Sequence, residues 1–313
     1  MRSKILSSKV KSTVSKYANG FNRFWLWAKK YSEISSVLPT SELHASLYLQ
    51  FLIDSCKHYS SVESAFYSIK WAHNLANLED PCDSDFVRSI VEASKRLLNR
   101  PILMKTPVDA DVIKSLFNNF SFPRSLTDLR LLPLCSLPYT GFLRYDELSS
   151  IRARHLLFQS EYLEIVIPSS KTDCYRKGNR VFIARTNSEY CAVAILDSYL
   201  KAADIDLKSD MIIFRSVTYF KTSNTFLLRK QNIKLSYTRT RDIVLSALSD
   251  IGLHSSEYGL HSFRAGGATA AANSGVPDRL FKLQGRWKTD IAKDGYVLDN
   301  VEKRLSVSKS LSI

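Results

Sequence analysis

The sequence is poor in the features that would place it among secreted, membrane or zinc proteins. It has five cysteines in 313 residues, and none form a Cys-x-x-Cys pair. This argues against a zinc site or a disulfide framework and for a reducing compartment inside a cell. Its most apolar run, residues 131–143, is short and interrupted by Pro133 and Pro138, so no bilayer-spanning segment is expected. The first residues lead into a stretch rich in serine and lysine, so no signal peptide is expected either.

Negative charge is also scarce. The chain has 44 Lys and Arg against 30 Asp and Glu, a net charge of +14. Residues 1–105 carry 15 basic and 9 acidic side chains, which leaves 29 and 21 for the remainder. Both parts are therefore positive, as expected if both face a long polyanion. Charge alone would suit DNA, RNA, an anionic membrane or simply a soluble basic surface.

The length and the 45% apolar content favour two domains with sizeable cores. In the first hundred residues, apolar side chains recur three or four apart in four stretches, which predicts a four-helix bundle. The second of these apolar stripes contains Leu43, Leu47 and Phe51. Asn99-Arg100-Pro101 should end the last helix. We therefore predict a helical domain at 1–101, a linker at 102–108 and a second domain at 109–313.

The second domain is predicted to be mainly α with one small antiparallel β-sheet. Asp109 or Asp111 should cap a helix that runs through Phe117, and another helix should lie between 125 and 137. Residues 162–167 and 180–183 are β-branched and aromatic, so they are expected to be strands joined by a hairpin turn. Further helices are expected at 189–202, at 239–251 and over the region 261–296, with breaks at Gly275 and Gly285.

Two segments each place two polar, ionisable side chains three residues apart on a predicted helix. In the first, TGFLRYDEL over 140–148, Arg144 stands where a helix should start and Glu147 follows one turn later. In the second, HSFR, His261 and Arg264 are three apart and share one helix face, and small residues follow that would allow close packing. Taken singly, each has an ordinary explanation, namely a surface ion pair and a capped core helix.

A third segment completes an ordered set. Gly285-Arg286-Trp287 is followed by Tyr296 nine residues after the tryptophan. An arginine, a lysine in a hairpin, His-x-x-Arg, Trp and Tyr, in this order, resemble the signature of tyrosine recombinases of the phage-integrase type. TGFLRYDEL resembles the family's first arginine box, SSKTD its lysine hairpin, HSFRAGGAT its second box, and GRW with KDGY its last. The overall pattern also looks like the recombinases of eukaryotic mobile elements such as the Crypton and DIRS-like groups.

The resemblance covers nearly the whole chain, because residues 1–101 resemble the family's core-binding (SAM-like) domain. It departs from the common pattern at one point. Many members have Leu-Gly-His where this chain has Gly285-Arg286-Trp287. Position 287 therefore offers an indole N–H donor in place of a titratable ring.

The resemblance implies a metal- and ATP-independent reaction with no cofactor. Two guanidiniums would hold the scissile phosphate, and a tyrosine would attack it to give a 3′-phosphotyrosine and a free 5′-hydroxyl. His261 would be a general base or phosphate ligand, and Glu147 would steady Arg144 or His261. Lys171 would be the general acid for the leaving oxygen, with Lys177 in the same hairpin as its rival. The full expected set is Arg144, Lys171, His261, Arg264, Trp287 and Tyr296, supported by Glu147.

The resemblance also implies an assembly. The two domains would close as a clamp around double-stranded DNA, and four protomers would act on two sites. The apolar-periodic tail 297–307 would pack on a neighbouring subunit or, alternatively, on its own domain. The expected location is intracellular: the nucleus in a eukaryote, the cytoplasm or nucleoid in a prokaryote. Two other functions stay open, a type IB topoisomerase and a domesticated DNA-binding protein that keeps only the fold.

Overall fold

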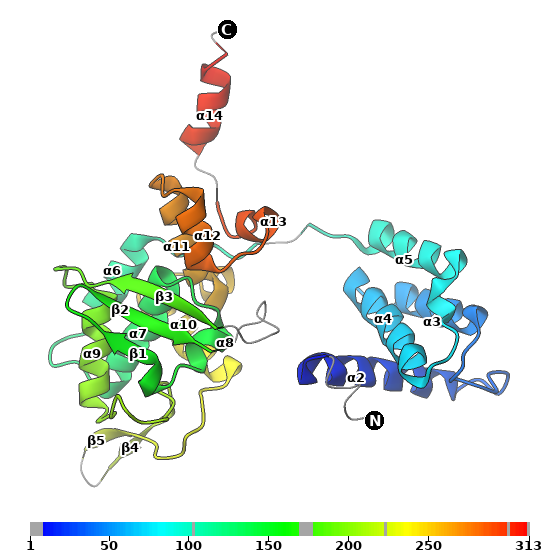
Figure 1. Ribbon diagram of the computed structural model, residues 1–313, viewed down its shortest axis with the longest axis horizontal. Coiled ribbons are helices and arrows are strands. Elements are labelled where there is room, and N and C mark those ends of the chain that lie inside the picture. The colour runs from blue at the N-terminus through cyan, green and yellow to red at the C-terminus, as the bar shows by residue number, and fades with distance from the viewer. Residues whose placement is uncertain (1–8, 102–103, 169–177, 222–223, 299–300, 312–313) are drawn as a thin grey trace. The chain divides into compact units, whose positions relative to one another are not determined.

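The computed structural model describes residues 9–101, 104–168, 178–221, 224–298 and 301–311, without the side chains of 302 and 303. The chain divides into two compact units, Met1–Leu103 and Met104–Ile313 (Figure 1). Among the described residues, no helix is both long enough and apolar enough to cross a membrane.

The described part of unit 1 is a bundle of four helices, as its periodicity predicts. They are α2 (Lys11–Ala28), α3 (Glu42–Ser55), α4 (Tyr59–Ala76) and α5 (Asp85–Leu98), with a short 3-10 turn at Pro81–Asp83. Phe24, Leu49 and Ile69 are fully buried in the core. Helices α2 and α4 pack closely at Gly20, since a Cβ there would lie only 2.1 Å from the Ser68 hydroxyl and glycine has none.

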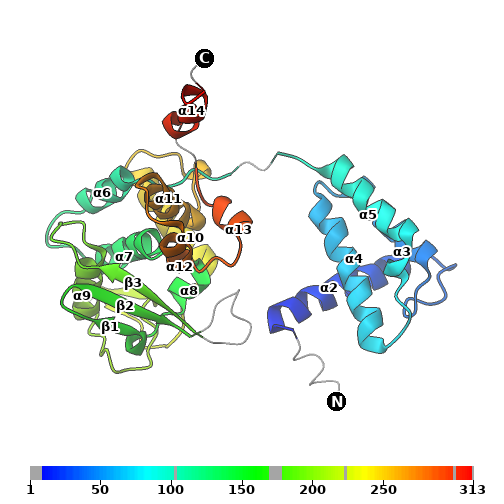
Figure 2. The same cartoon turned by 45° about the horizontal axis from the view of Figure 1, so that its top comes forward.

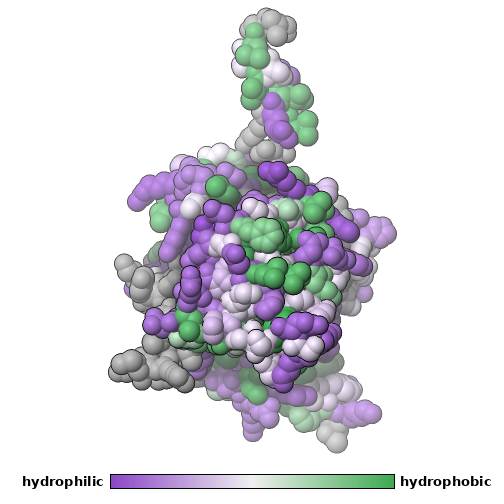
Figure 3. All heavy atoms as spheres, turned by 90° about the vertical axis from the view of Figure 1, so that its right-hand side faces the viewer, coloured by the Kyte–Doolittle hydropathy of each residue, from purple (hydrophilic) through white to green (hydrophobic). Residues whose placement is uncertain are grey.

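The predicted apolar stripe of α3 does not face this core. Leu43, Leu47 and Phe51 are 57%, 50% and 41% exposed, whereas Tyr48 and Leu49 are buried. Helix α3 is apolar on more than one face, so periodicity alone selects the wrong face. Figure 3, viewed from the side of unit 1, shows apolar side chains gathered within a largely hydrophilic surface.

Unit 2 is mainly helical, as predicted, and its described residues form two small antiparallel sheets. Strands β1 (Leu156–Phe158), β2 (Tyr162–Ile167) and β3 (Asn179–Ala184) form one sheet in that order, with Leu163 opposite Ile183. The β2–β3 pairing confirms the predicted hairpin, whose turn lies outside the described residues. Strand β1 and a second hairpin, β4 (Val217–Phe220) with β5 (Thr225–Leu228), were not predicted.

The helices of unit 2 are, in order, α6 (Ala110–Asn118), α7 (Leu126–Thr140), α8 (Tyr145–Ser149), α9 (Ala192–Ala202), α10 (Tyr237–Asp250), α11 (Leu260–Asn273), α12 (Asp278–Gly285), α13 (Asp290–Asp294) and α14 (Val301–Lys309). Asp109 caps α6 by accepting a hydrogen bond from the Val112 amide at 2.8 Å, as predicted. Gly275, with φ +75°, separates α11 from α12. The three-stranded sheet packs on α7 and α9 (Figure 2).

Helix α7 continues past the predicted end at Leu137 to Thr140, and Pro133 and Pro138 lie inside it. A proline inside a helix removes a backbone hydrogen bond and normally disfavours the helix. Here both prolines are buried, and α7 packs against α9 on one side and α11 on another. Burial on several faces therefore stabilises the last turn, which delivers the chain to the first predicted box at Gly141.

Candidate active site

The first box is built around the start of α8. Arg144 is the N-cap residue, and the Glu147 carboxylate accepts from the Arg144 amide at 2.8 Å and from Arg144 Nη1 at 3.1 Å. Glu147 is 2% exposed and Arg144 16% exposed at their side chains. Burial by itself would raise the pKa of Glu147, but the Arg286 and Arg144 guanidiniums outweigh it, so this pKa lies below its usual value.

The second box lies at the start of α11, which packs unusually close to its neighbours. A Cβ at Gly266 would lie 1.7 Å from the Val108 carbonyl oxygen, and one at Gly267 would lie 1.8 Å from that of Tyr139. The small residues after His-x-x-Arg therefore have the packing role expected from the sequence. The helix exposes His261 and buries Arg264 completely.

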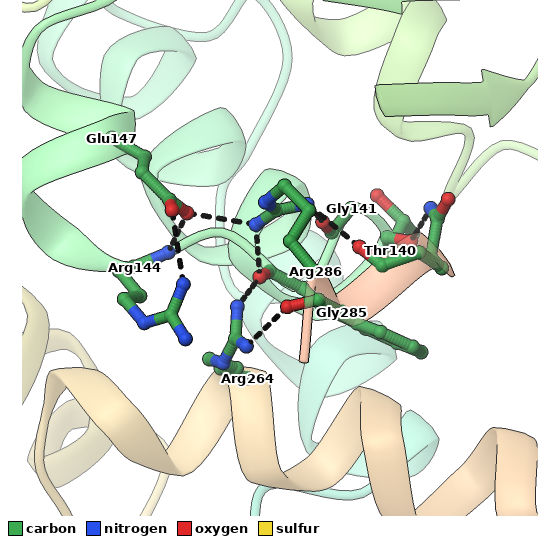
Figure 4. Close-up of polar contacts among 9 residues, drawn as sticks. Thr140, Gly141, Arg144, Glu147, Arg264, Gly285 and Arg286 are labelled. Atoms are coloured by element: carbon green, nitrogen blue, oxygen red, sulfur yellow. Dashed lines mark hydrogen bonds and ion pairs between the residues drawn. The ribbon is translucent and has the colours of Figure 1, made fainter. Parts of the chain in front are cut away.

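Arg264 is held by backbone carbonyls and aromatic rings. Its Nη1 donates to the Phe142 carbonyl. Its Nη2 donates to the Gly285 carbonyl at 2.7 Å (Figure 4). The guanidinium carbon lies 4.8 Å from the ring centroid of Trp287 and 4.7 Å from that of Tyr296. Burial, together with the neighbouring positive charges of Arg144 and Arg286, lowers the pKa of Arg264. An anion at this place would relieve that penalty.

The third box brings an indole into the same cluster. Trp287 is 6% exposed, and its Nε1 has no hydrogen-bond partner among the described residues. A Cβ at Gly285 would lie 1.9 Å from the Trp287 ring, so only glycine leaves room for the ring there. An unpartnered buried donor is costly, and a phosphate oxygen would satisfy it.

Tyr296 follows α13 and lies half-buried against these groups. Its ring centroid is 5.6 Å from that of Trp287 and 6.5 Å from that of His261. Its backbone is tied to α11, because the Thr269 hydroxyl donates to the Tyr296 carbonyl at 3.3 Å and accepts from the Leu298 amide at 3.0 Å.

An ion-pair network fixes α13 to α12 ahead of this tyrosine. Lys293 lies 2.5 Å from Asp278 and 3.2 Å from Asp290, and Lys282 bridges the same two carboxylates at 3.1 and 2.6 Å. The short helix before Tyr296 is therefore held by charge as well as by packing.

The structure thus brings together most of the residues that the sequence singled out. Lys171 and its rival Lys177 lie outside the described residues. The group gathered in one place is Arg144, Glu147, His261, Arg264, Trp287 and Tyr296.

Two further residues of the cluster were missed by the sequence analysis. Thr269 was noted only as part of the second box. Arg286 ion-pairs with Glu147 at 2.7 Å in the site interior. The sequence held one signal for Arg286, because this residue stands where many members of the resembled family have glycine. The structure gives Arg286 a φ of +55°, a conformation that favours glycine.

Comparison with known proteins agrees with the predicted resemblance. No protein-family profile matches the chain. An "Integrase/recombinase xerD homolog" of Selenomonas ruminantium is 26% identical over 294 residues, covering 93% of this chain and 82% of that protein.

Solved structures share the fold at low sequence identity. The XerH site-specific recombinase bound to a palindromic difH substrate superposes with a TM-score of 0.60 at 12% identity, over 95% of this chain and 77% of that one. The Tn1549 transposon integrase with transposon right end DNA superposes with a TM-score of 0.59 at 12% identity, over 96% of this chain and 99% of that one. A lambda integrase dimer on a COC′ core site superposes with a TM-score of 0.55 at 17% identity, over 95% of this chain and 93% of that one. The resemblance to the tyrosine recombinase, or phage integrase, family is therefore confirmed in both sequence and fold.

Proposed function

We propose that the chain is a site-specific DNA recombinase that cuts and rejoins strands through a 3′-phosphotyrosine. The observation that carries this proposal is the position of Tyr296, whose ring lies 4.7 Å from the buried Arg264 guanidinium, beside Trp287. A potential nucleophile thus adjoins fixed donors for a phosphate. The similar XerH protein is described in a post-cleavage complex with its DNA substrate.

Arg144, Arg264 and Trp287 would bind the scissile phosphate. Two guanidiniums and an indole N–H can donate to the non-bridging oxygens and neutralise the charge that develops in the transition state. Guanidiniums keep their charge at physiological pH, so they can take the role that a metal ion has in many nucleases. This is the basis for proposing a metal-independent reaction.

The Tyr296 oxygen would attack phosphorus, and the bond from phosphorus to the 5′-oxygen would break. The phenol proton would pass to His261 or to water, because a phenol has an ordinary pKa of about 10 and its proton needs an acceptor. Lys171 would give a proton to the leaving 5′-oxygen. The phosphodiester energy is kept in the tyrosyl ester, so the reverse attack by a 5′-hydroxyl rejoins the strand without ATP.

DNA would have to open this arrangement before cleavage. Arg264 is completely buried, with the Tyr296 and Trp287 rings beside it. A phosphate reaches this guanidinium only if one of the covering side chains moves. We propose that DNA binding shifts the Tyr296 ring off Arg264 and leaves its hydroxyl in line with phosphorus.

Double-stranded DNA is the proposed partner of both units. The segment 215–241 of unit 2 has no Asp or Glu and carries seven cations, of which six are exposed or half-buried. The buried one is Arg215, and the other six are Lys221, Arg229, Lys230, Lys234, Arg239 and Arg241. Such a run suits contacts to phosphates. We further propose that the units clamp the duplex and that four protomers assemble on two sites.

The C-terminal tail is the proposed link between protomers. In α14, Val301, Leu305 and Val307 are 68%, 47% and 67% exposed. Val301 and Leu305 are four residues apart and so share one face of the helix, and an exposed apolar face of this kind suits packing against another protein surface.

The decisive experiment uses nicked suicide DNA substrates drawn from the flanks of the gene. Wild-type protein should form a covalent adduct in EDTA, whereas Tyr296→Phe should bind the same DNA without forming one. Site-independent relaxation of supercoiled DNA by a monomer would favour the topoisomerase. Binding to every substrate without any adduct would favour the non-catalytic protein. An adduct that persists in Tyr296→Phe would reject Tyr296 as the nucleophile.

A further inference from the structure

Arg286 is an unusual residue for its position. It follows α12 with φ +55°, in the left-handed region that disfavours residues with a Cβ. Its side chain is 3% exposed. A long cation in such a backbone conformation, inside the protein, is unfavourable on both counts. It persists only where its contacts offset these costs.

Those contacts join the first box to the third. Arg286 Nη2 donates to the Phe142 carbonyl at 2.7 Å and to Glu147 Oε2 at 2.7 Å. Its Nη1 donates to the Gln284 carbonyl at 2.6 Å and to the Gly141 carbonyl at 3.3 Å. The Phe142 carbonyl that accepts from Arg286 also accepts from Arg264 Nη1.

The charges around Glu147 give Arg286 a second effect. Two guanidiniums, those of Arg144 and Arg286, form ion pairs with the buried Glu147 carboxylate at 3.1 and 2.7 Å, and the Arg264 guanidinium lies near enough for all three positive charges to influence one another. Without Arg286, Arg144 would be the ion-pair partner left to Glu147 among the residues that the structure describes. The Arg144 charge would then be neutralised by the carboxylate and less available to a phosphate.

We propose that Arg286 is a positioning residue of the cleavage reaction. It fixes the Phe142 carbonyl that orients Arg264, and it neutralises Glu147 so that Arg144 stays available to the phosphate. This inference rests on the proposed function. Arg286 itself does not touch the DNA, because its side chain is buried and its two terminal nitrogens face protein acceptors.

The test combines single and double substitutions. Arg286→Gly removes the guanidinium and leaves a residue that readily adopts a φ of +55°. We expect the rate of adduct formation on the suicide substrate to fall by about 10–100-fold, as is usual when a group that orients a reacting side chain is lost. Non-covalent DNA affinity should change by less than about threefold, as for a position that makes no DNA contact.

The second substitution separates positioning from folding. In Arg286→Gly/Glu147→Gln the unneutralised carboxylate is gone, so Arg144 is released and the rate should recover by about tenfold, since removing both partners costs less than removing one. Arg286→Lys, which keeps the charge with fewer donors, should be intermediate. Tyr199→Phe is the stability control, because it loses a buried hydrogen bond to the Ile213 carbonyl in a different core cluster.

The outcomes are distinct. Adduct formation by Arg286→Gly at the wild-type rate overturns the inference. So does a slow Arg286→Gly that Glu147→Gln fails to rescue, or a loss of rate that merely follows the unfolding midpoint as in Tyr199→Phe. If wild-type protein forms no adduct on any substrate, the proposed function fails, and that result is seen before any Arg286 variant is compared.

Discussion

At the scale of single residues, the site depends on two non-glycine residues with positive φ, Phe142 at +46° and Arg286 at +55°. Each such conformation costs about 1–2 kcal/mol. The Phe142 ring packs 5.9 Å from both Phe281 and Trp287, and its carbonyl accepts from Arg264 and Arg286. Backbone strain therefore lies at the carbonyl that orients the buried arginine, where it can prepare the site for phosphate.

Gly285→Ala tests how closely Trp287 must pack. The new Cβ would lie 1.9–2.4 Å from the Trp287 ring, so the indole must leave its present position beside Arg264. We expect a loss of about 1–3 kcal/mol in the free energy of unfolding. Adduct formation should be about 10–100-fold slower, because misplacing a group by about 1 Å has effects of this size. Chemical denaturation and single-turnover cleavage measure the two effects.

Gly259→Ala is the matched control. Its Cβ would lie 3.9 Å from the Lys105 side chain, and its φ of −161° is open to any residue. Because Gly259 is the N-cap residue of α11 and alanine is less favoured there than glycine, stability should fall by at most about 1 kcal/mol. Cleavage should stay near wild type. Cleavage by Gly285→Ala at the control's rate would show that the position of Trp287 does not matter.

The Glu147 carboxylate predicts a dependence of stability on pH. Its pKa is lowered in the folded protein, so its stabilising contribution is complete above the unfolded pKa of about 4.3 and is lost as pH falls through the folded pKa. Glu147→Gln should lose about 3 kcal/mol at pH 7, because it leaves Arg286 buried without its counter-charge. The difference from wild type should shrink below about pH 4. Urea unfolding at several pH values measures it, and a constant difference would contradict the assignment.

At the scale of elements, the sequence predicts what depends on local pattern. The cap of α6 by Asp109 and the helix start at Arg144 follow from residues within one turn of each other. The β2–β3 hairpin follows from two short strand patterns that are neighbours in the sequence. The burial of α3 does not, because a helix with two apolar faces needs its neighbours to decide between them. Arg286 also escaped prediction, since its partner Glu147 lies 139 residues away. Such pairings arise only when α12 and α8 come together.

The lysine hairpin between β2 and β3 calls for a test in which chemistry, and not geometry, identifies the residue. If Lys171 protonates the leaving 5′-oxygen, a substrate with sulfur at that bridging position barely needs the proton. Lys171→Ala should therefore cleave ordinary DNA slowly and be largely rescued by the sulfur substrate. Arg264→Ala should not be rescued, because its charge is aimed at the non-bridging oxygens.

Lys177→Ala is the control within the same hairpin. Rescue of Lys177→Ala but not of Lys171→Ala would transfer the role to Lys177. Equal rescue of the lysine and arginine variants would mean that sulfur speeds every pathway, and the general-acid assignment would then have no support.

At the scale of the whole molecule, charge and assembly have separate tasks. The net charge of +14 would attract DNA to either unit at long range in the proposed function, and this attraction would weaken with salt. Recombination needs more than attraction, because strands must pass between protomers held on two sites. In the proposed assembly, the site that cuts is complete within unit 2, whereas the tail serves only the contact between protomers. Cleavage and recombination should therefore respond differently to the same change.

Removal of residues 299–313 tests that separation. If the tail packs on a neighbour, the shortened protein should unfold at the wild-type midpoint and form adducts on a single suicide site within about twofold of wild type, as expected for a distant surface change. Recombination between two sites should fall at least about tenfold with the loss of an apolar interface contact. Sedimentation on paired sites should show the tetramer reduced to smaller complexes.

In the full chain, Val301→Ser with Leu305→Ser should reproduce the defect, whereas Lys309→Ser on the same helix should not. A lowered unfolding midpoint together with slow single-site cleavage would instead place the tail on its own domain, and the proposed link between protomers would be wrong.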